Sequence, residues 1–280
     1  MIEDRKPIIL SVSGLRKKIG DVTAVDNVSF ELESGSSLAI VGESGSGKTT
    51  VARMIVGLTK PTEGTITLAG SDQSRPAHSL KERITRARQV QLVFQDPYSS
   101  LDPRYSTEQT LDEIVRLHTT LRSKTERRRR VAELADLVGL SSTQLNVRPR
   151  ALSGGQRQRI AIARALAAEP RLLILDEPVA ALDVSIQAQV LNLLSDIRRE
   201  TGMSYLFISH DLAVVRQVSE HVVVMQKGQV VESGRTADVL DHPTNPYTQV
   251  LRESVPRPGW RPRRSLAAEI VGSSKGIQRQ

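Results

Sequence analysis

The stretch Gly42-Glu43-Ser44-Gly45-Ser46-Gly47-Lys48-Thr49 decides how this chain folds. It follows the apolar run 38–41 and precedes apolar residues at helical spacing, namely Val51, Met54, Ile55 and Leu58. A strand, a glycine-rich loop and a helix in this order form a phosphate cradle, because glycines let backbone N–H groups curl around an anion. We expect Lys48 to contact the β- and γ-phosphates and Thr49 to hold Mg²⁺, so the chain binds a nucleoside triphosphate. A glycine-rich turn that binds nothing is the weaker alternative here.

The composition describes an ordinary globular protein. Of 280 residues, 39% are hydrophobic and 25% are charged. No apolar run approaches the ~20 residues that span a bilayer, and residues 1–7 do not resemble a signal peptide. The absence of cysteine excludes disulfides and thiolate metal sites. The net charge of +8 fits nucleic acid, anionic lipid or a basic surface without a partner, and by itself selects none of them.

Residues 8–41 predict short strands, with turn signals at Gly14, at Gly20 and at Ser34-Gly35. After the loop and its helix, residues 60–64 form a turn, and a strand over 65–68 ends at Gly70. The polar segment 71–88 has no pattern that assigns it. Residues 90–94 then predict a buried strand that delivers Gln95 to its carboxyl end.

From residue 97 to about 152 the pattern is helical, which predicts a helical insertion in an α/β domain. Ser123 and Glu126 fit a capping box, and Gly139 stands where a helix ends. The run Arg127–Arg130 lies at the start of this helix without interleaved aromatic residues. We therefore prefer a solvated helix face to a nucleic-acid patch.

A second dense cluster begins at Leu152-Ser153-Gly154-Gly155-Gln156 and opens a helix that stops before Pro170. A capping box from Ser153 to Gln156 explains the start of the helix but not its two glycines, each of which costs about 1 kcal/mol relative to alanine. We expect something to approach this backbone closely, and a helix N-terminus suits an anion.

Residues 172–175 predict a strand buried on both faces, and it ends in Asp176-Glu177. If this strand lies beside the phosphate-loop strand, Asp176 reaches Mg²⁺ and Glu177 can orient or deprotonate an attacking water. Asp183 is expected to cap a helix. The buried face of that helix is predicted to contain Val184, Ala188, Leu191, Leu194 and Ile197.

One more buried strand, 204–208, delivers His210 to the same edge, where the residues alone do not decide between a structural and a phosphate-binding histidine. A terminal hairpin is expected over 222–231. Beyond residue 254 the composition shifts to Pro, Arg, Ser and Gly, which predicts a domain of residues 1–254 and a flexible tail, 255–280.

These motifs, in this order, resemble the ATP-binding cassette (ABC) ATPase family. The phosphate loop matches its Walker A motif, Gln95 its Q-loop, 152–156 its signature, 172–177 its Walker B motif, Asp183 its D-loop and His210 its switch histidine. The resemblance implies a P-loop ATPase core with a mostly parallel sheet, an N-terminal antiparallel β subdomain and an inserted α-helical subdomain.

The same resemblance assigns roles around ATP and Mg²⁺. Glu177, His210 and Gln95 would be catalytic, and Thr49, Gln95 and Asp176 would hold the metal. The nucleotide would be bound by Gly42, Glu43, Ser44, Gly45, Ser46, Gly47, Lys48, Thr49, Thr50 and Ile19 and, across a subunit interface, by Ser153, Gly154, Gly155, Gln156 and Asp183.

One phosphate loop and one signature motif occur, without an internal repeat. If the signature acts across an interface, a monomer cannot form a complete site. A head-to-tail dimer with two buried ATP molecules is therefore expected, whose second ABC subunit is another copy or a paralogue.

Residues 94–104 and 242–248 are similar to segments of oligopeptide and dipeptide import cassettes. This similarity implies an ATPase at the cytoplasmic face of the plasma membrane, with two permease subunits and, indirectly, a solute-binding protein. The same group also serves nickel, glutathione and other small solutes.

Two positions depart from the family pattern. Ile19 stands where an aromatic residue often stacks on adenine, and Val179-Ala180 replaces a usual Thr-Ser pair. Alternatives are a soluble ABC ATPase acting on nucleic acid or ribosomes, and an export cassette. Only residues 49–152 separate Lys48 from Ser153, which leaves no room for a long coiled coil, so no nucleic-acid partner is expected.

Overall fold

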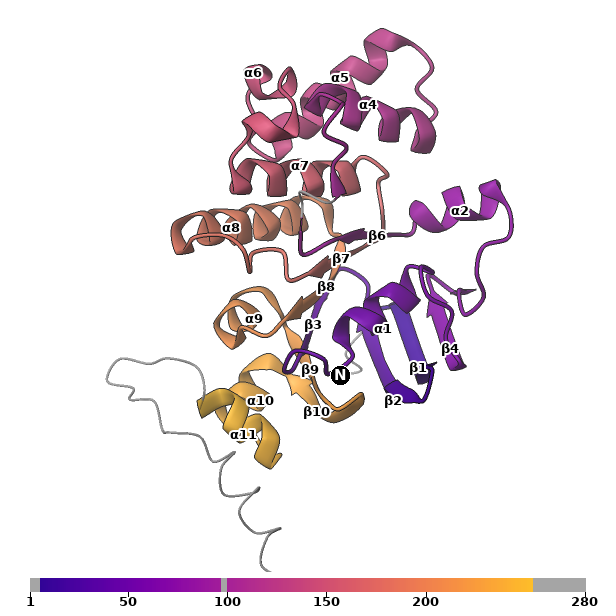
Figure 1. The fold of residues 1–280 in the computed structure, drawn as a ribbon, viewed down its shortest axis with the longest axis vertical. Coiled ribbons are helices and arrows are strands. Elements are labelled where there is room, and N and C mark those ends of the chain that lie inside the picture. The colour runs from indigo at the N-terminus through magenta and orange to yellow at the C-terminus, as the bar shows by residue number, and fades with distance from the viewer. Residues whose placement is uncertain (1–5, 97–99, 254–280) are drawn as a thin grey trace, which may run out of the picture.

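The computed structural model describes residues 6–96 and 100–253, which form two sheets surrounded by helices (Figure 1). A six-stranded sheet has the order β10-β9-β3-β8-β7-β6, and a four-stranded sheet has the order β2-β1-β4-β5. The strands are β1 Ile8–Ile19, β2 Val22–Glu33, β3 Ser37–Val41, β4 Glu63–Leu68, β5 Ser71–Asp72, β6 Val90–Val93, β7 Leu172–Asp176, β8 Ser204–Ser209, β9 His221–Gln226 and β10 Gln229–Arg235. The α/β fold class predicted from the sequence is confirmed.

The larger sheet is parallel except for the β9–β10 hairpin. Strands β3, β7 and β8 are buried along their whole length, which explains their continuous apolar sequences. Parallel strands end at one edge of a sheet, so the segments that follow β3, β6, β7 and β8 lie at a common edge. The sequence left open whether the strand ending in Asp176 lies directly beside β3, and the structure places β8 between β3 and β7.

The smaller sheet is the predicted antiparallel β subdomain, with β1 paired to β2 and β4. The turn expected at Gly14 was wrong, because this residue lies inside β1. Its φ is +58°, its N–H donates to Ser29 Oγ, and the pairing of β1 with β2 shifts register between Val12 and Leu15. Gly14 therefore belongs to a bulge that bends a long strand.

The helices are α1 Lys48–Ile55, α2 Leu80–Ala87, α4 Thr107–His118, α5 Lys124–Leu137, α6 Ser142–Leu145, the 3₁₀ turn Pro149–Ala151, α7 Gly154–Leu166, α8 Val184–Thr201, α9 Leu212–Val218, α10 Thr236–Asp241 and α11 Pro246–Glu253. Helix α1 packs between the two sheets, since Val51 and Met54 share a core with residues of both. Leu58, predicted in this helix, lies beyond its end and is exposed. Helices α10 and α11 follow the hairpin that was expected to be terminal, and the predicted tail 255–280 lies outside the described residues.

Helices α4, α5 and α6 gather at one end of the molecule, beyond α7 (Figure 1). They come between β6 and α7 in the chain, so the predicted helical insertion is confirmed. The capping box predicted at the start of α5 is also present, since Glu126 N donates to Ser123 Oγ and Ser123 N to Glu126 Oε2. Helix α2 fills the segment that the sequence left unassigned.

Part of the predicted buried face of α8 was wrong. Val184 is 83% exposed and Ala188 is also exposed. In the first turns of α8 it is Ile186 that turns inward, toward the start of α7, where a Cβ added to Gly155 would lie 2.4 Å from Ile186 Cγ2. Gly155 is buried, so the absence of its side chain allows α7 and α8 to approach closely.

The arginine run at the start of α5 is held by acidic side chains. Arg127 pairs with Asp112 of α4 at 2.8 Å. The other three arginines also form ion pairs, Arg128 with Glu108, Arg129 with Glu133, and Arg130 with Glu133 and Glu169. The predicted solvated face describes Arg128 and Arg129, whose side chains are 62% and 84% exposed, whereas those of Arg127 and Arg130 are only 16% and 29% exposed.

Arg127 and Arg129 differ in how deeply their side chains are buried, so we expect them to contribute unequally to stability. The Arg127 side chain is 16% exposed and joins α5 to α4, whereas the Arg129 side chain is 84% exposed. We expect Arg127→Ala to lower the free energy of unfolding by about 1–2 kcal/mol and Arg129→Ala by less than about 0.5 kcal/mol. Urea titration of both variants measures the difference. Equal losses would contradict the unequal roles.

The contact between α7 and α8 gives a second expectation. Gly155→Ala should cost about 1–3 kcal/mol of stability, because the new methyl group overlaps Ile186. Gly154→Ala is the matched control, since its added Cβ would meet Leu182 at an ordinary 3.4 Å. Adding Ile186→Ala to Gly155→Ala should restore much of the loss. Urea unfolding checks all three, and an unperturbed Gly155→Ala would refute the packing explanation.

Candidate active site

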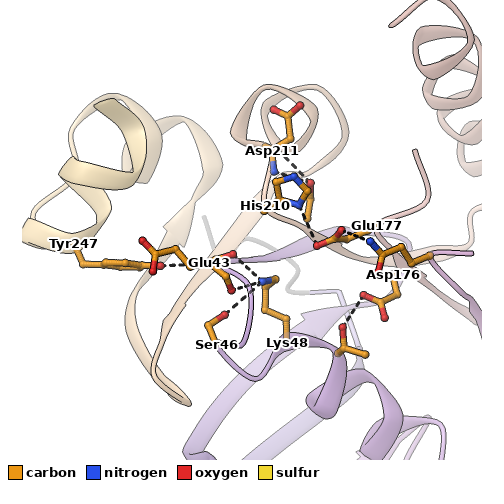
Figure 2. A network of polar contacts seen from close by, with 12 residues as sticks. Glu43, Ser46, Lys48, Asp176, Glu177, His210, Asp211 and Tyr247 are labelled. Carbon is orange, nitrogen blue, oxygen red and sulfur yellow. Dashed lines mark hydrogen bonds and ion pairs between the residues drawn. The ribbon is translucent and has the colours of Figure 1, made fainter. Parts of the chain in front are cut away.

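Polar residues from four strand ends meet at the carboxyl edge of the larger sheet (Figure 2). Lys48 begins α1 after the glycine-rich loop that follows β3, and Asp176 ends β7. Glu177 follows β7, and His210 follows β8. Gln95 comes shortly after β6. The structure thus brings together the residues that the sequence predicted to act on one nucleotide.

The glycine-rich loop is held between neighbouring backbones. A Cβ on Gly42 would lie 2.1 Å from the Met225 carbonyl oxygen of β9, and one on Gly47 would lie 2.5 Å from the Ala24 carbonyl oxygen of β2. Gly45 has a φ of +82°, and no other described atom would lie within 4 Å of an added Cβ. Gly42 and Gly47 therefore allow tight packing of the loop on both strands, while Gly45 faces open space.

Lys48 is 5% exposed, and its ammonium group is satisfied by the loop itself. Nζ donates to the carbonyl oxygens of Gly42 and Glu43 at 2.7 and 2.8 Å, with Ser46 Oγ at 3.4 Å. Burial lowers the pKa of Lys48, against the raising effect of Glu177, Asp176 and Glu43. No described side chain caps the start of α1, so its first N–H groups can bind an anion.

Asp176 forms the link between β7 and α1. It is 4% exposed, and its Oδ1 accepts a hydrogen bond of 3.1 Å from Thr49 Oγ1. Strand β8 lies between β3 and β7, so these two strands do not touch. Helix α1, which carries Thr49, contacts β7 and so brings Thr49 to Asp176. Burial raises the pKa of Asp176, and the Thr49 hydrogen bond opposes that effect.

The donor set at this position suits Mg²⁺. Mg²⁺ prefers hard oxygen ligands and is usually held by one or two carboxylates together with substrate phosphates and water. A buried carboxylate and a hydroxyl group beside a phosphate loop match that pattern, and a cation would relieve the cost of the buried charge. Among residues 6–96 and 100–253, no three His, Asp or Glu side chains are grouped as a metal site.

Glu177 is fixed by contacts on both of its carboxylate oxygens. Oε2 accepts from Gln95 Nε2 at 2.9 Å, and Oε1 lies 3.0 Å from His210 Nδ1. Its backbone has φ +48°, uncommon for a residue with a side chain, and its N–H donates to the Ile208 carbonyl oxygen of β8. Backbone and side-chain contacts together aim this carboxylate, as an acid–base residue requires.

The signature segment is separate from this network. Ser153 caps α7 in a capping box with Gln156, and among the described residues no hydrogen bond joins either of them to the phosphate loop. The close approach that its glycines were expected to allow is made at Gly155 by Ile186 of the same chain. The glycines therefore do not by themselves indicate a ligand.

Three further positions singled out in the sequence lie outside the Glu177 network. Ile19 ends β1 opposite Val22, and these side chains are 58% and 68% exposed. Asp183 caps α8 as expected, its Oδ1 accepting from Ile186 N. Val179 is 4% exposed in the main core, so burial explains an apolar residue where the family usually has a hydroxyl.

Sequence reasoning missed one contact of the phosphate loop. The Tyr247 hydroxyl of α11 accepts a hydrogen bond of 3.0 Å from Glu43 N (Figure 2). The segment 242–248 was singled out only for its similarity to import cassettes. The residue type, an aromatic ring with a polar tip, signals that the hydroxyl needs a partner but not which partner it finds.

Comparison with known proteins identifies the family. Residues 25–180 match the family described as ABC transporter, and residues 231–276 match the oligopeptide/dipeptide transporter C-terminal region. The oligopeptide transport ATP-binding protein AppF of Bacillus subtilis is 48% identical over 245 residues, 87% of this chain and 74% of that protein. The dipeptide transport ATP-binding protein DppF of Escherichia coli is 46% identical over 236 residues, covering 84% of this chain and 70% of its own length.

Solved structures agree with the sequence relatives. The ATP-binding cassette MJ0796, in a dimeric post-hydrolysis state bound to ADP and Pi, has a TM-score of 0.73 at 29% identity and covers 81% of this chain and 98% of that one. CbiO1 from Clostridium perfringens, part of the ABC transporter complex cbiONQ, has a TM-score of 0.74, also at 29% identity, and covers 85% and 92%. The family resemblance read from the motifs is thus confirmed, and the chain belongs to the ABC transporter family.

Proposed function

We propose that this chain is the ATP-hydrolysing subunit of an ABC importer for peptides or a related small solute, and that it powers separate permease subunits. The observation that carries the proposal is the meeting of Lys48, the Thr49–Asp176 pair and the Glu177 network at one sheet edge. The relatives named as oligopeptide and dipeptide transport proteins supply the solute class.

The loop and Lys48 bind the triphosphate in this proposal. Lys48 exchanges its carbonyl partners, Gly42 and Glu43, for the β- and γ-phosphates. Its buried position makes that exchange favourable, because a desolvated ammonium group interacts strongly with an anion. Thr49 and Asp176 hold Mg²⁺, which neutralises phosphate charge when bound. Ile19 and Val22 offer adenine an aliphatic surface.

Glu177 orients and deprotonates the attacking water. The carboxylate is the base, and the Gln95 and His210 contacts restrict where it points. His210, which follows β8 at the same edge, contacts the terminal phosphate as well in this proposal. Gln95 also connects this site to the segment that leads into the helical insertion, which couples hydrolysis to movement of those helices.

The site is completed by a second subunit. Ser153, Gly154, Gly155 and Gln156 at the start of α7, with Asp183, act on ATP held by the facing copy or paralogue. Ser153 and Asp183 are exposed, as an interface role requires, and so is Val184, which follows Asp183. Closure of this head-to-tail dimer on two ATP molecules and its reopening after hydrolysis drive transport.

The subunit acts at the cytoplasmic face of the plasma membrane against two permeases, with a solute-binding protein delivering the cargo. Within the part of the chain that the structure describes, no helix is long and apolar enough to cross a bilayer. The alternative of a nucleic-acid or ribosome ATPase rested on charge and on the arginine run, whose four members are all paired with carboxylates. The relatives favour import over export.

Glu177→Gln tests the proposal. The amide keeps the shape of the side chain and one of its two acceptor oxygens, but it cannot take a proton from water. We expect ATP hydrolysis to fall by about 10²–10⁴-fold while ATP binding persists and a nucleotide-loaded dimer accumulates. Phosphate release, equilibrium ATP titration and light scattering measure the three effects.

Glu200→Gln, an exposed change near the end of α8, is the control and should hydrolyse ATP like the unmodified chain. Hydrolysis by Glu177→Gln at the control rate would remove Glu177 from its assigned role. Stimulation of the unmodified chain by nucleic acid, and not by permeases in a lipid membrane, would reject the importer.

A further inference from the structure

The C-terminal helix α11 reaches back to the phosphate loop through one side chain. Tyr247 and Glu43 are 204 positions apart in sequence, yet the Tyr247 hydroxyl accepts the Glu43 N–H at 3.0 Å. Figure 2 shows the ring extending from α11 to the second residue of the loop. The bond is to the backbone, so it fixes the path of the loop whatever side chain stands at position 43.

Hydrogen bonds to β10 hold the start of α11 in place. Asn245 Oδ1 accepts from Tyr247 N at 2.8 Å, and Asn245 Nδ2 donates to the Val231 carbonyl oxygen of β10. Glu232 of β10 accepts from Thr244 N and Thr244 Oγ1 at 2.7 and 2.8 Å. Tyr247 is therefore attached through Asn245 to the same sheet that carries the loop.

The phenol is suited to act as an acceptor. Tyr247 is half-buried against the main core, and Leu251 one turn later is 8% exposed. Burial raises the pKa of Tyr247, so the phenol stays neutral through the physiological range and its oxygen accepts without bringing a charge to the loop. A neutral acceptor does not compete with the phosphates for Lys48.

The backbone of Glu43 makes hydrogen bonds with two side chains. Its N–H is bound by Tyr247, and its carbonyl oxygen is bound by Lys48 Nζ at 2.8 Å. When Lys48 turns to a phosphate, the Glu43 carbonyl oxygen keeps the 3.2 Å hydrogen bond from Ser46 N inside the loop. The Tyr247 bond then still ties residue 43 to a helix outside the loop. The restraint matters most in the nucleotide-bound state, in which the loop must keep its N–H groups converged.

We propose that Tyr247 is a positioning residue for nucleotide binding, which holds the first turn of the phosphate loop in its binding conformation from the C-terminal helix. This inference rests on the proposed function, because it assumes that the loop binds ATP. Tyr247 acts through the loop backbone and takes no part in the chemical step. Its loss should therefore weaken nucleotide affinity and leave the turnover rate of the loaded site nearly unchanged.

Tyr247→Phe tests this by removing one oxygen while keeping the packed ring. We expect the Kd for ATP, and the KM, to rise about fivefold, the size of effect expected for one neutral hydrogen bond, with kcat within about twofold. Amide exchange of residues 42–47 should also become faster. Tyr105→Phe, the same deletion on a 45% exposed tyrosine before α4, is the matched control and should change none of these values.

A second variant leaves the Tyr247 hydroxyl in place and removes the side chain that supports Tyr247. Asn245→Ala removes the anchor of Tyr247 to β10 and should weaken ATP binding in the same direction, with thermal unfolding followed to confirm that the fold persists. Tyr247→Phe that binds ATP like Tyr105→Phe, or that lowers kcat at unchanged KM, overturns the proposal. Lys48→Ala separates it from the proposed function: if that variant still binds ATP normally, the nucleotide site itself has been misassigned.

Discussion

Parallel pairing of β3, β8, β7 and β6 is the constraint on which the site depends. The ends of β3 and β8 are paired at Val41 and Ser209, and those of β7 and β8 at Asp176 and Ile208. Because the strand ends are level, the segments that follow them must share one edge. Side chains along these strands alternate between two hydrophobic cores, so a slip of one residue would move each of them into the other core. The packing that fixes the register therefore also fixes the geometry of the site.

The phosphate loop is held from both ends of the chain. Gly47 packs against Ala24 of the N-terminal sheet, and Gly42 against Met225 of the last hairpin. Tyr247 adds a hydrogen bond from α11. The N-terminal sheet, the last hairpin and α11 therefore all help to fix the shape of the phosphate loop.

The sequence predicted which residues meet at the sheet edge better than it predicted the packing around them. The link of Thr49 to Asp176 followed from a motif and a general rule about strand ends, although the order of the strands did not. For Gly155 the sequence signalled that a side chain is forbidden, but the neighbour that forbids it, Ile186, belongs to another helix. The contact between Tyr247 and Glu43 could not be predicted for the same reason, because local sequence patterns carry no information about a partner 204 positions away.

We propose that the loop holds Lys48 until a triphosphate replaces its carbonyl partners. A crystal structure of the Glu177→Gln variant with ATP and Mg²⁺ tests this exchange. We expect Lys48 Nζ to leave the Gly42 and Glu43 carbonyl oxygens for the β- and γ-phosphates, with Thr49 and Asp176 beside the metal. A nucleotide bound elsewhere, with Lys48 still on those two carbonyl oxygens, would overturn the proposal.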